Sequence, residues 1–203
     1  MSLSKEECAS ISDAIRAAEA RTSGEIVCVL AQSSSHFAAL PILLAAVLAL
    51  ALPWILVAFT GMTVHRILSL QVIVFLLVAG VLSLPRVQVT LIPPRARRAA
   101  AHRVAVEQFM IRGIARKQDR SGLLIFVSLA EHYARIIADD GIAARVPSAH
   151  WRAAVDALIA HMREGRIADG FVAAIGLCGD ELAEHFPHDG TGRHELPDRI
   201  YLI

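Results

Sequence analysis

The stretch FAALPILLAAVLALALPWILVAF, residues Phe37–Phe59, contains no charged residue. It comes shortly after SGEIVCVLAQSSS, in which the apolar run Ile26–Leu30 is typical of a buried β-strand. As a helix rising about 1.5 Å per residue, Phe37–Phe59 would extend roughly 35 Å, enough to cross the hydrocarbon core of a bilayer. The sequence therefore predicts a transmembrane helix directly after the first strand of an α/β domain.

A second uncharged run follows after a short connector. It reads ILSLQVIVFLLVAGVLSL, Ile67–Leu84, and Val64 can extend it toward the connector. Two such runs in tandem predict a helical hairpin at about residues 37–59 and 64–84, with both flanks on one side of the membrane. The alternative, a pair of buried core helices, would need a larger core than a chain of 203 residues offers.

Arginines indicate which side the flanks occupy. The connector offers one arginine, Arg66, whereas the segment after the second run carries five and no acid: Arg86, Arg95, Arg97, Arg98 and Arg103. Because cytoplasmic segments of membrane proteins are enriched in Lys and Arg, we expect both flanks in the cytoplasm and the hairpin in the inner (plasma) membrane. The same arginines are suited to contact anionic lipid headgroups.

The overall composition fits a soluble part joined to a few spans. Hydrophobic residues make up 55% of the chain, and the net charge of +1 argues against a nucleic-acid partner. The three cysteines, Cys8, Cys28 and Cys178, are far apart and form no CxxC pair, so no disulfide framework is expected. Cys8 and Cys28 lie within apolar patterns and are expected to be buried thiols.

Helices and strands alternate on both sides of the hairpin. Ser4 and Glu7 form a capping-box pattern that begins a first helix. The elements expected after the hairpin are a helix over Arg95–Lys117, strands at Leu123–Leu129 and Tyr133–Ala138, a loop from Asp139, a helix from Ala149, a helix over Ile167–Phe186, and an irregular tail, 187–203. A single early strand cannot form a sheet, so residues 1–36 and 86–186 are predicted to form one α/β domain, interrupted by residues 37–85.

Three segments, in this order, carry a family resemblance: SGEIVCVL, RSGLLIFVSLAEHYARIIADDGI and GRIADGFVAAI. Together they resemble the TPM-domain family, in its branch of bacterial membrane proteins with a helical hairpin inside the domain. Ser23–Ile26 match the residues before the family's first strand, Gly122–Val127 its glycine-led strand, and Arg135–Ile142 its third strand and acidic loop. The resemblance implies an α/β/α sandwich with a small mixed sheet.

For function, the resemblance implies several roles. Relatives of this fold are linked to acid phosphatase activity, to divalent-cation binding, and to the assembly or upkeep of membrane complexes. We expect a membrane-tethered interaction or assembly module without catalytic residues or cofactor, whose partners are the lipid bilayer and other membrane proteins. The alternative is a divalent-cation-dependent phosphatase. A transporter or channel subunit is disfavoured, because the two apolar runs contain no ionisable residue to form an ion path.

One acidic pair stands out as a candidate metal site. Asp139 and Asp140, followed by Gly141, come where the third predicted strand ends. Two adjacent carboxylates offer oxygen ligands to Ca²⁺ or Mg²⁺, although a full Ca²⁺ site needs about six, so only weak binding is expected. Family members carry a further Asp after this loop, whereas this chain reads ARVPSAHW, with no acid.

Overall fold

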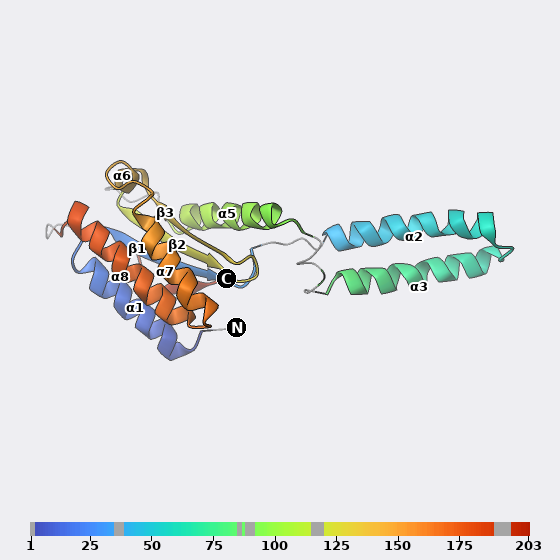
Figure 1. Ribbon diagram of the computed structural model, residues 1–203, viewed down its shortest axis with the longest axis horizontal. Helices are drawn as coiled ribbons and strands as arrows, with labels where there is room; N and C mark the ends of the chain where they lie inside the picture. Colours follow the sequence, from blue (N-terminus) through green and yellow to red (C-terminus); the bar gives the residue numbers. More distant parts are fainter. Residues whose placement is uncertain (1–2, 35–38, 85–86, 88–91, 115–119, 189–195) are drawn as a thin grey trace. The chain divides into compact units, whose positions relative to one another are not determined.

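The computed structural model describes residues 3–34, 39–84, 87, 92–114, 120–188 and 196–203. The chain divides into two compact units. One combines Met1–Ser34 with Arg98–Ile203, and the other is Ser35–Arg97. The first is an α/β unit and the second contains a helical hairpin (Figure 1).

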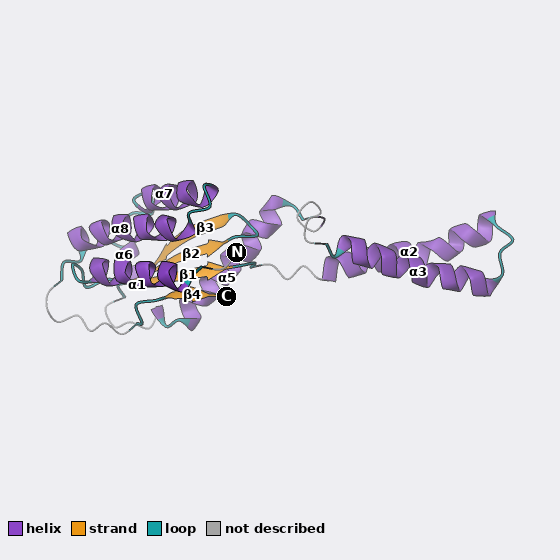
Figure 2. Cartoon of the chain, turned by 90° about the horizontal axis from the view of Figure 1, so that it is seen from below, coloured by secondary structure: helices purple, strands orange, loops and turns teal. Residues whose placement is uncertain are grey.

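The α/β unit is built on a four-stranded mixed sheet in the order β3-β2-β1-β4 (Figure 2). The strands are β1 (Glu25–Ala31), β2 (Gly122–Ser128), β3 (Tyr133–Ala138) and β4 (Ile200–Leu202). β1 is parallel to β2 and β4, while β3 is antiparallel to β2. The small mixed sheet expected from the sequence is confirmed, and it joins strands from both flanks of the hairpin.

Helices cover both faces of this sheet (Figure 1). On one face, α1 (Lys5–Glu19), α7 (Trp151–Arg163) and α8 (Ile167–His185) enclose the larger apolar cluster, in which Phe171 is completely buried. On the other face, α5 (Pro94–Ile111) contributes Ala105 and Phe109 to a smaller cluster with Phe126. The α/β/α sandwich is thereby confirmed.

Local sequence explains the first elements. Both hydrogen bonds of the capping box between Ser4 and Glu7 are present at the start of α1. All residues of β1 and β2 are buried, as expected for parallel strands covered on both faces, which read as continuous apolar runs rather than alternating ones. After α5, Gly113 has a φ of 76°, a conformation that glycine adopts without the penalty of a Cβ.

The structure corrects two expectations. The tail was expected to be irregular, but Ile200–Leu202 forms β4, because the outer edge of β1 is open to pairing and Ile200 is buried against the core. The loop from Asp139 was expected to be free of helix, but it contains the short helix α6 (Asp140–Ala143). The expected end of the helix before β2, Lys117, lies outside the described residues.

The second unit contains α2 (Ala39–Phe59) and α3 (Val64–Leu82), which pack against each other. Both are long and apolar enough to cross a membrane, with mean hydropathies of 2.8 over Pro41–Phe59 and 2.1 over Val64–Leu82. Only 11% and 6% of these windows are buried, unlike the core helix of a soluble protein. Large apolar side chains such as Trp54 (82% exposed) and Phe59 (85%) point away from the pair.

Candidate functional site

The acidic pair predicted from the sequence lies at the amino-terminal edge of β1 and β2, because β3 runs antiparallel to β2. The Asp139 amide donates to the Gly122 carbonyl at 2.9 Å. Asp139 caps α6: its side chain accepts a hydrogen bond from the Asp140 amide at 2.7 Å, and its carbonyl accepts from Ala143. One oxygen of the Asp139 carboxylate is therefore already occupied by a hydrogen bond from the backbone.

The two carboxylates have different surroundings. Asp139 is 6% exposed, and its Oδ2 has no hydrogen-bond partner among the described residues. The side chain of Asp140 is 84% exposed and pairs with Arg120 Nη1 at 2.9 Å. Gly141 packs against the Arg120 carbonyl so closely that a Cβ would lie 2.5 Å from that oxygen.

This donor set falls short of a complete cation site. Among the described residues, no group of three or more His, Cys, Asp and Glu side chains is arranged to hold a metal ion. Ca²⁺ takes six to eight oxygen ligands. Here the Asp139 carboxylate accepts the capping hydrogen bond of α6, and the Asp140 carboxylate pairs with Arg120. Weak cation binding at Asp139 and Asp140 stays a prediction.

A second polar cluster occupies the opposite edge, where the parallel strands β1 and β2 end. Glu131, 5% exposed, accepts hydrogen bonds from the Ser34 amide (3.0 Å), from Ser33 Oγ (3.1 Å) and from Ser128 Oγ. Ser34 Oγ also donates to Ser128 Oγ at 2.7 Å. Through these hydrogen bonds, Glu131 links the residues that follow β1, Ser33 and Ser34, to Ser128 at the end of β2.

Beside Glu131 lies a pocket of about 880 Å³, which we term the basic groove. Its charged and polar lining consists of Gln32, Arg98, His132, Tyr133 and Arg163, and its larger apolar lining residues are Leu129, Ile159, Met162 and Ile167. The volume falls within the range of small-molecule sites, and the carboxyl ends of parallel strands are where open α/β sheets usually bind ligands.

The turn between β2 and β3 forms part of this groove. His132 has a φ of 48°, which is uncommon for a residue other than glycine, and its amide donates to the Leu129 carbonyl at 3.2 Å. Tyr133 lies beside it, with its hydroxyl 3.4 Å from His102 Nδ1 on α5 and its ring edge-on to Phe126 at 6.4 Å. These contacts fix the wall of the groove against the core.

Sequence reasoning missed this edge. In the sequence, Ala130–His132 stand only as the link between two expected strands, and Ser33 and Ser34 only follow the expected strand Ile26–Leu30. A usable signal existed: the carboxyl ends of two parallel strands meet at one edge, which would have placed the serines after β1 near Ser128 and Glu131. That inference required knowing that β1 and β2 are parallel neighbours.

A third polar cluster lies at the amino end of β1. Burial raises the pKa of Glu19 from 4.5 to about 8, helped by the nearby carboxylates of Asp198 and Glu25. A hydrogen bond from the Ile26 amide to Glu19 Oε1, at 2.7 Å, opposes this rise. Glu19 is therefore largely protonated at neutral pH and acts as a structural group that joins α1 to β1.

The buried cysteines offer no nucleophile. Burial raises the pKa of Cys28 and of Cys178, so neither thiol is suited to act as a nucleophile, whereas Cys8 is only half-buried.

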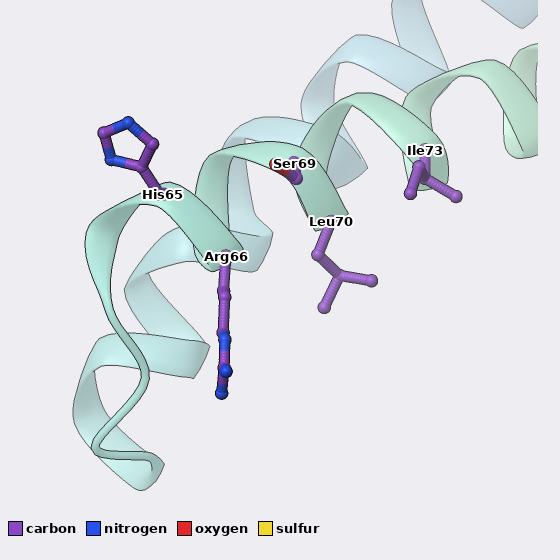
Figure 3. A pocket seen from close by; sticks show the side chains of 5 residues that line it. All are labelled: His65, Arg66, Ser69, Leu70 and Ile73. Carbon is purple, nitrogen blue, oxygen red and sulfur yellow. The ribbon is translucent and has the colours of Figure 1, made fainter.

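A hollow of about 310 Å³ on α3 is lined by residues of that helix alone, between His65 and Ile73 (Figure 3). His65 and Arg66 point in different directions there and form no common site.

Comparisons with known proteins agree with the fold. The family model described as TPM domain matches residues 86–181. The structure is similar to the NMR structure of the BA42 protein from the psychrophilic bacterium Bizionia argentinensis, with a TM-score of 0.63 and 21% identity over 100% of this chain and 97% of that one. No match was found among curated proteins.

Proposed function

Since this chain carries a TPM domain, we propose that the domain is tethered to a membrane by the hairpin between β1 and α5 and acts as an interaction or assembly module at the membrane surface. One observation carries the proposal. Two helices of membrane-spanning length, with large apolar side chains exposed, are inserted in a chain whose flanks build one sheet.

The energetics favour a bilayer around the hairpin. Each fully exposed Leu, Ile, Val or Phe side chain that leaves water contributes about 1.5–3 kcal/mol. Side chains such as Leu50 (65% exposed) and Val57 (67%) recur along α2, and Leu76 and Leu77 along α3. Because helices satisfy their backbone hydrogen bonds internally, α2 and α3 are suited to hydrocarbon.

The distribution of arginines supports a cytoplasmic α/β unit and an inner-membrane location. α5 carries Arg95, Arg97, Arg98 and Arg103, whereas the residues between the apolar parts of α2 and α3 carry one arginine, Arg66, in the first turn of α3. An excess of basic residues beside membrane spans marks the cytoplasmic side.

The test of the tether is extraction of membranes at alkaline pH. The full chain should stay in the pellet, as integral proteins do. Leu48→Arg combined with Leu50→Arg should release a large fraction, since each arginine near the centre of a span costs about 2.5–3.5 kcal/mol in insertion. Ala153→Arg, on the exposed face of α7, is the matched control and should stay in the pellet. Release of the unsubstituted chain would overturn the tether.

The module role has its own test. A photo-crosslinking side chain placed at Asp156, which is exposed on α7, should yield discrete adducts with other membrane proteins in intact membranes. Placed at Trp54, within α2, it should yield mainly lipid adducts. If the Asp156 position gives no protein adduct while the Trp54 position reacts, the interaction role fails and the tether stands.

The second candidate is a divalent-cation-dependent phosphatase, supported by the buried Asp139 Oδ2 that lacks a described hydrogen-bond partner. Calorimetric titration of the full chain in nonionic detergent with Ca²⁺ or Mg²⁺ tests its premise. Binding in the range of about 10⁻⁴–10⁻³ M that Asp139→Asn abolishes would support it. Equal heats from both proteins up to millimolar cation would remove it.

A further inference from the structure

The basic groove has the charge pattern of an anion site. Its described lining includes Arg98, His132 and Arg163 and no Asp or Glu. Within the part of the chain that the structure describes, neither Arg98 nor Arg163 forms an ion pair, unlike Arg21, Arg120 and Arg166 on the same unit. Guanidinium groups that are not engaged by carboxylates are well suited to bind phosphate.

The remainder of the lining is apolar. Ile159 and Met162 of α7 and Ile167 at the start of α8 form a wall with Leu129. A free phosphate would leave this wall in contact with water, whereas a ligand with a phosphate group and a hydrocarbon portion would use both kinds of surface. The groove therefore fits an anionic amphiphile better than a soluble anion.

The place of the groove in the chain indicates the source of such a ligand. Gln32 stands shortly before α2, and the segment from Gln32 to Ala39 reaches at most about 25 Å when fully extended. Arg98 is the first residue of the α/β unit after the hairpin. On both sides of the hairpin, the chain therefore joins the α/β unit close to a residue that lines the groove.

We propose that the basic groove binds the phosphate headgroup of an anionic phospholipid, with Arg98 and Arg163 on the phosphate and the α7–α8 wall against the first part of the acyl chains. This site rests on the proposed function and deepens it. The hairpin anchors the chain in the membrane, and lipid binding in the groove makes the domain sensitive to the lipid composition of that membrane.

The experiment titrates the full chain in nonionic detergent with three probes: short-chain phosphatidylglycerol, short-chain phosphatidylcholine, and glycerol phosphate. Phosphatidylglycerol should bind most tightly. Arg98→Gln and Arg163→Gln should each weaken it about fivefold, because an arginine at an anionic surface contributes roughly that factor. Arg152→Gln, on the exposed face of α7 outside the groove, is the matched control and should bind as the unsubstituted chain does.

A further variant tests the groove even if the arginine variants fail to fold. Ala130→Glu places a negative charge in the groove at an exposed position and should abolish phosphatidylglycerol binding without shifting the thermal midpoint. Equal affinity for phosphatidylcholine, or no effect of the Arg98, Arg163 and Ala130 substitutions, overturns the proposal. Equal affinity for glycerol phosphate overturns the lipid source and assigns the groove to soluble phosphate esters.

The outcomes separate this inference from the proposed function. If the chain resists alkaline extraction but no probe binds, the groove proposal fails alone. If the chain is extracted as a peripheral protein yet phosphatidylglycerol binds through Arg98 and Arg163, the tether fails and the lipid site stands.

Discussion

Glu19 couples the stability of the α/β unit to pH. The residue is 3% exposed, and the pKa of its carboxyl rises from 4.5 to about 8 on folding, mainly through desolvation. A group with a raised folded-state pKa stabilises the fold fully below its unfolded pKa, and that contribution is lost as the pH rises through the folded value. For Glu19 the window lies between about pH 4.5 and 8.

We expect Glu19→Gln to remove this dependence. Glutamine keeps an oxygen for the Ile26 amide and an N–H in place of the carboxyl proton, while it cannot ionise. Across the window, the unfolding free energy of the unsubstituted chain should fall by up to about 1.4 kcal/mol per pH unit relative to the variant. Denaturant unfolding of the full chain in nonionic detergent, at several pH values, measures this difference. Parallel pH profiles for the two proteins would show that Glu19 does not titrate in this window.

Polar clusters could be predicted from the sequence only where their residues are neighbours along the chain. Asp139 and Asp140 are adjacent, so the pair was recognisable. Glu131 was not, because the Ser34 amide that it accepts from lies 97 positions away. Whether such a carboxyl is exposed in a turn or buried in a hydrogen-bonded cluster depends on strand pairing, which local patterns do not encode.

At the scale of elements, β4 depends on a few contacts made by one side chain. The ring of Tyr201 packs against two guanidinium groups: Cζ of Arg112, the residue after α5, lies 3.7 Å from the ring centroid, and Cζ of Arg199 lies 4.8 Å from it. Backbone hydrogen bonds continue the pairing beyond the strand, from the Gln32 amide to the Ile203 carbonyl (2.8 Å) and from the Ile203 amide to the Leu30 carbonyl (3.0 Å).

We expect Tyr201→Ala to loosen β4. The loss of two partly exposed cation–π contacts should cost about 1–2 kcal/mol. Amide hydrogen exchange should report it as faster exchange at Gln32 and Ile203, with the centre of β2 unchanged. Tyr201→Phe keeps the ring and should exchange as the unsubstituted chain does. Unchanged protection at Gln32 in Tyr201→Ala would show that backbone pairing alone holds β4.

Elements differed in how readily the sequence revealed them. α2, α3, β1 and β2 are long uniform runs whose burial or exposure follows from composition, so pattern alone identified them. β4 has three residues and follows a polar segment. It forms because the edge of β1 is available and because Arg112, the residue after α5, packs against Tyr201. Both contacts depend on the tertiary structure. α6 is a single turn set by the Asp139 cap.

At the scale of the whole molecule, the position of the insertion follows from the topology. Parallel neighbours such as β1 and β2 cannot be joined by a tight turn and need a crossover connection, which α5 provides. A segment added at the start of a crossover leaves the register of β1 and β2 untouched, and the entropy of closing a longer connection grows slowly with its length. An inserted helical hairpin is therefore tolerated at this point of the fold.

The central claim is that the hairpin crosses the membrane and returns, leaving both halves of the α/β unit on the cytoplasmic side. Three single cysteines test it in a Cys8→Ser background: Gly61→Cys in the connector, Asp13→Cys on α1 and Asp156→Cys on α7, all at exposed positions. They are labelled in intact cells with a membrane-impermeant thiol reagent. Cys28 and Cys178 remain, since both are buried.

We predict that Gly61→Cys reacts from outside, whereas Asp13→Cys and Asp156→Cys react only after the membrane is permeabilised. Labelling of Asp13→Cys and Asp156→Cys on opposite sides, or identical accessibility of all three positions, would contradict the account.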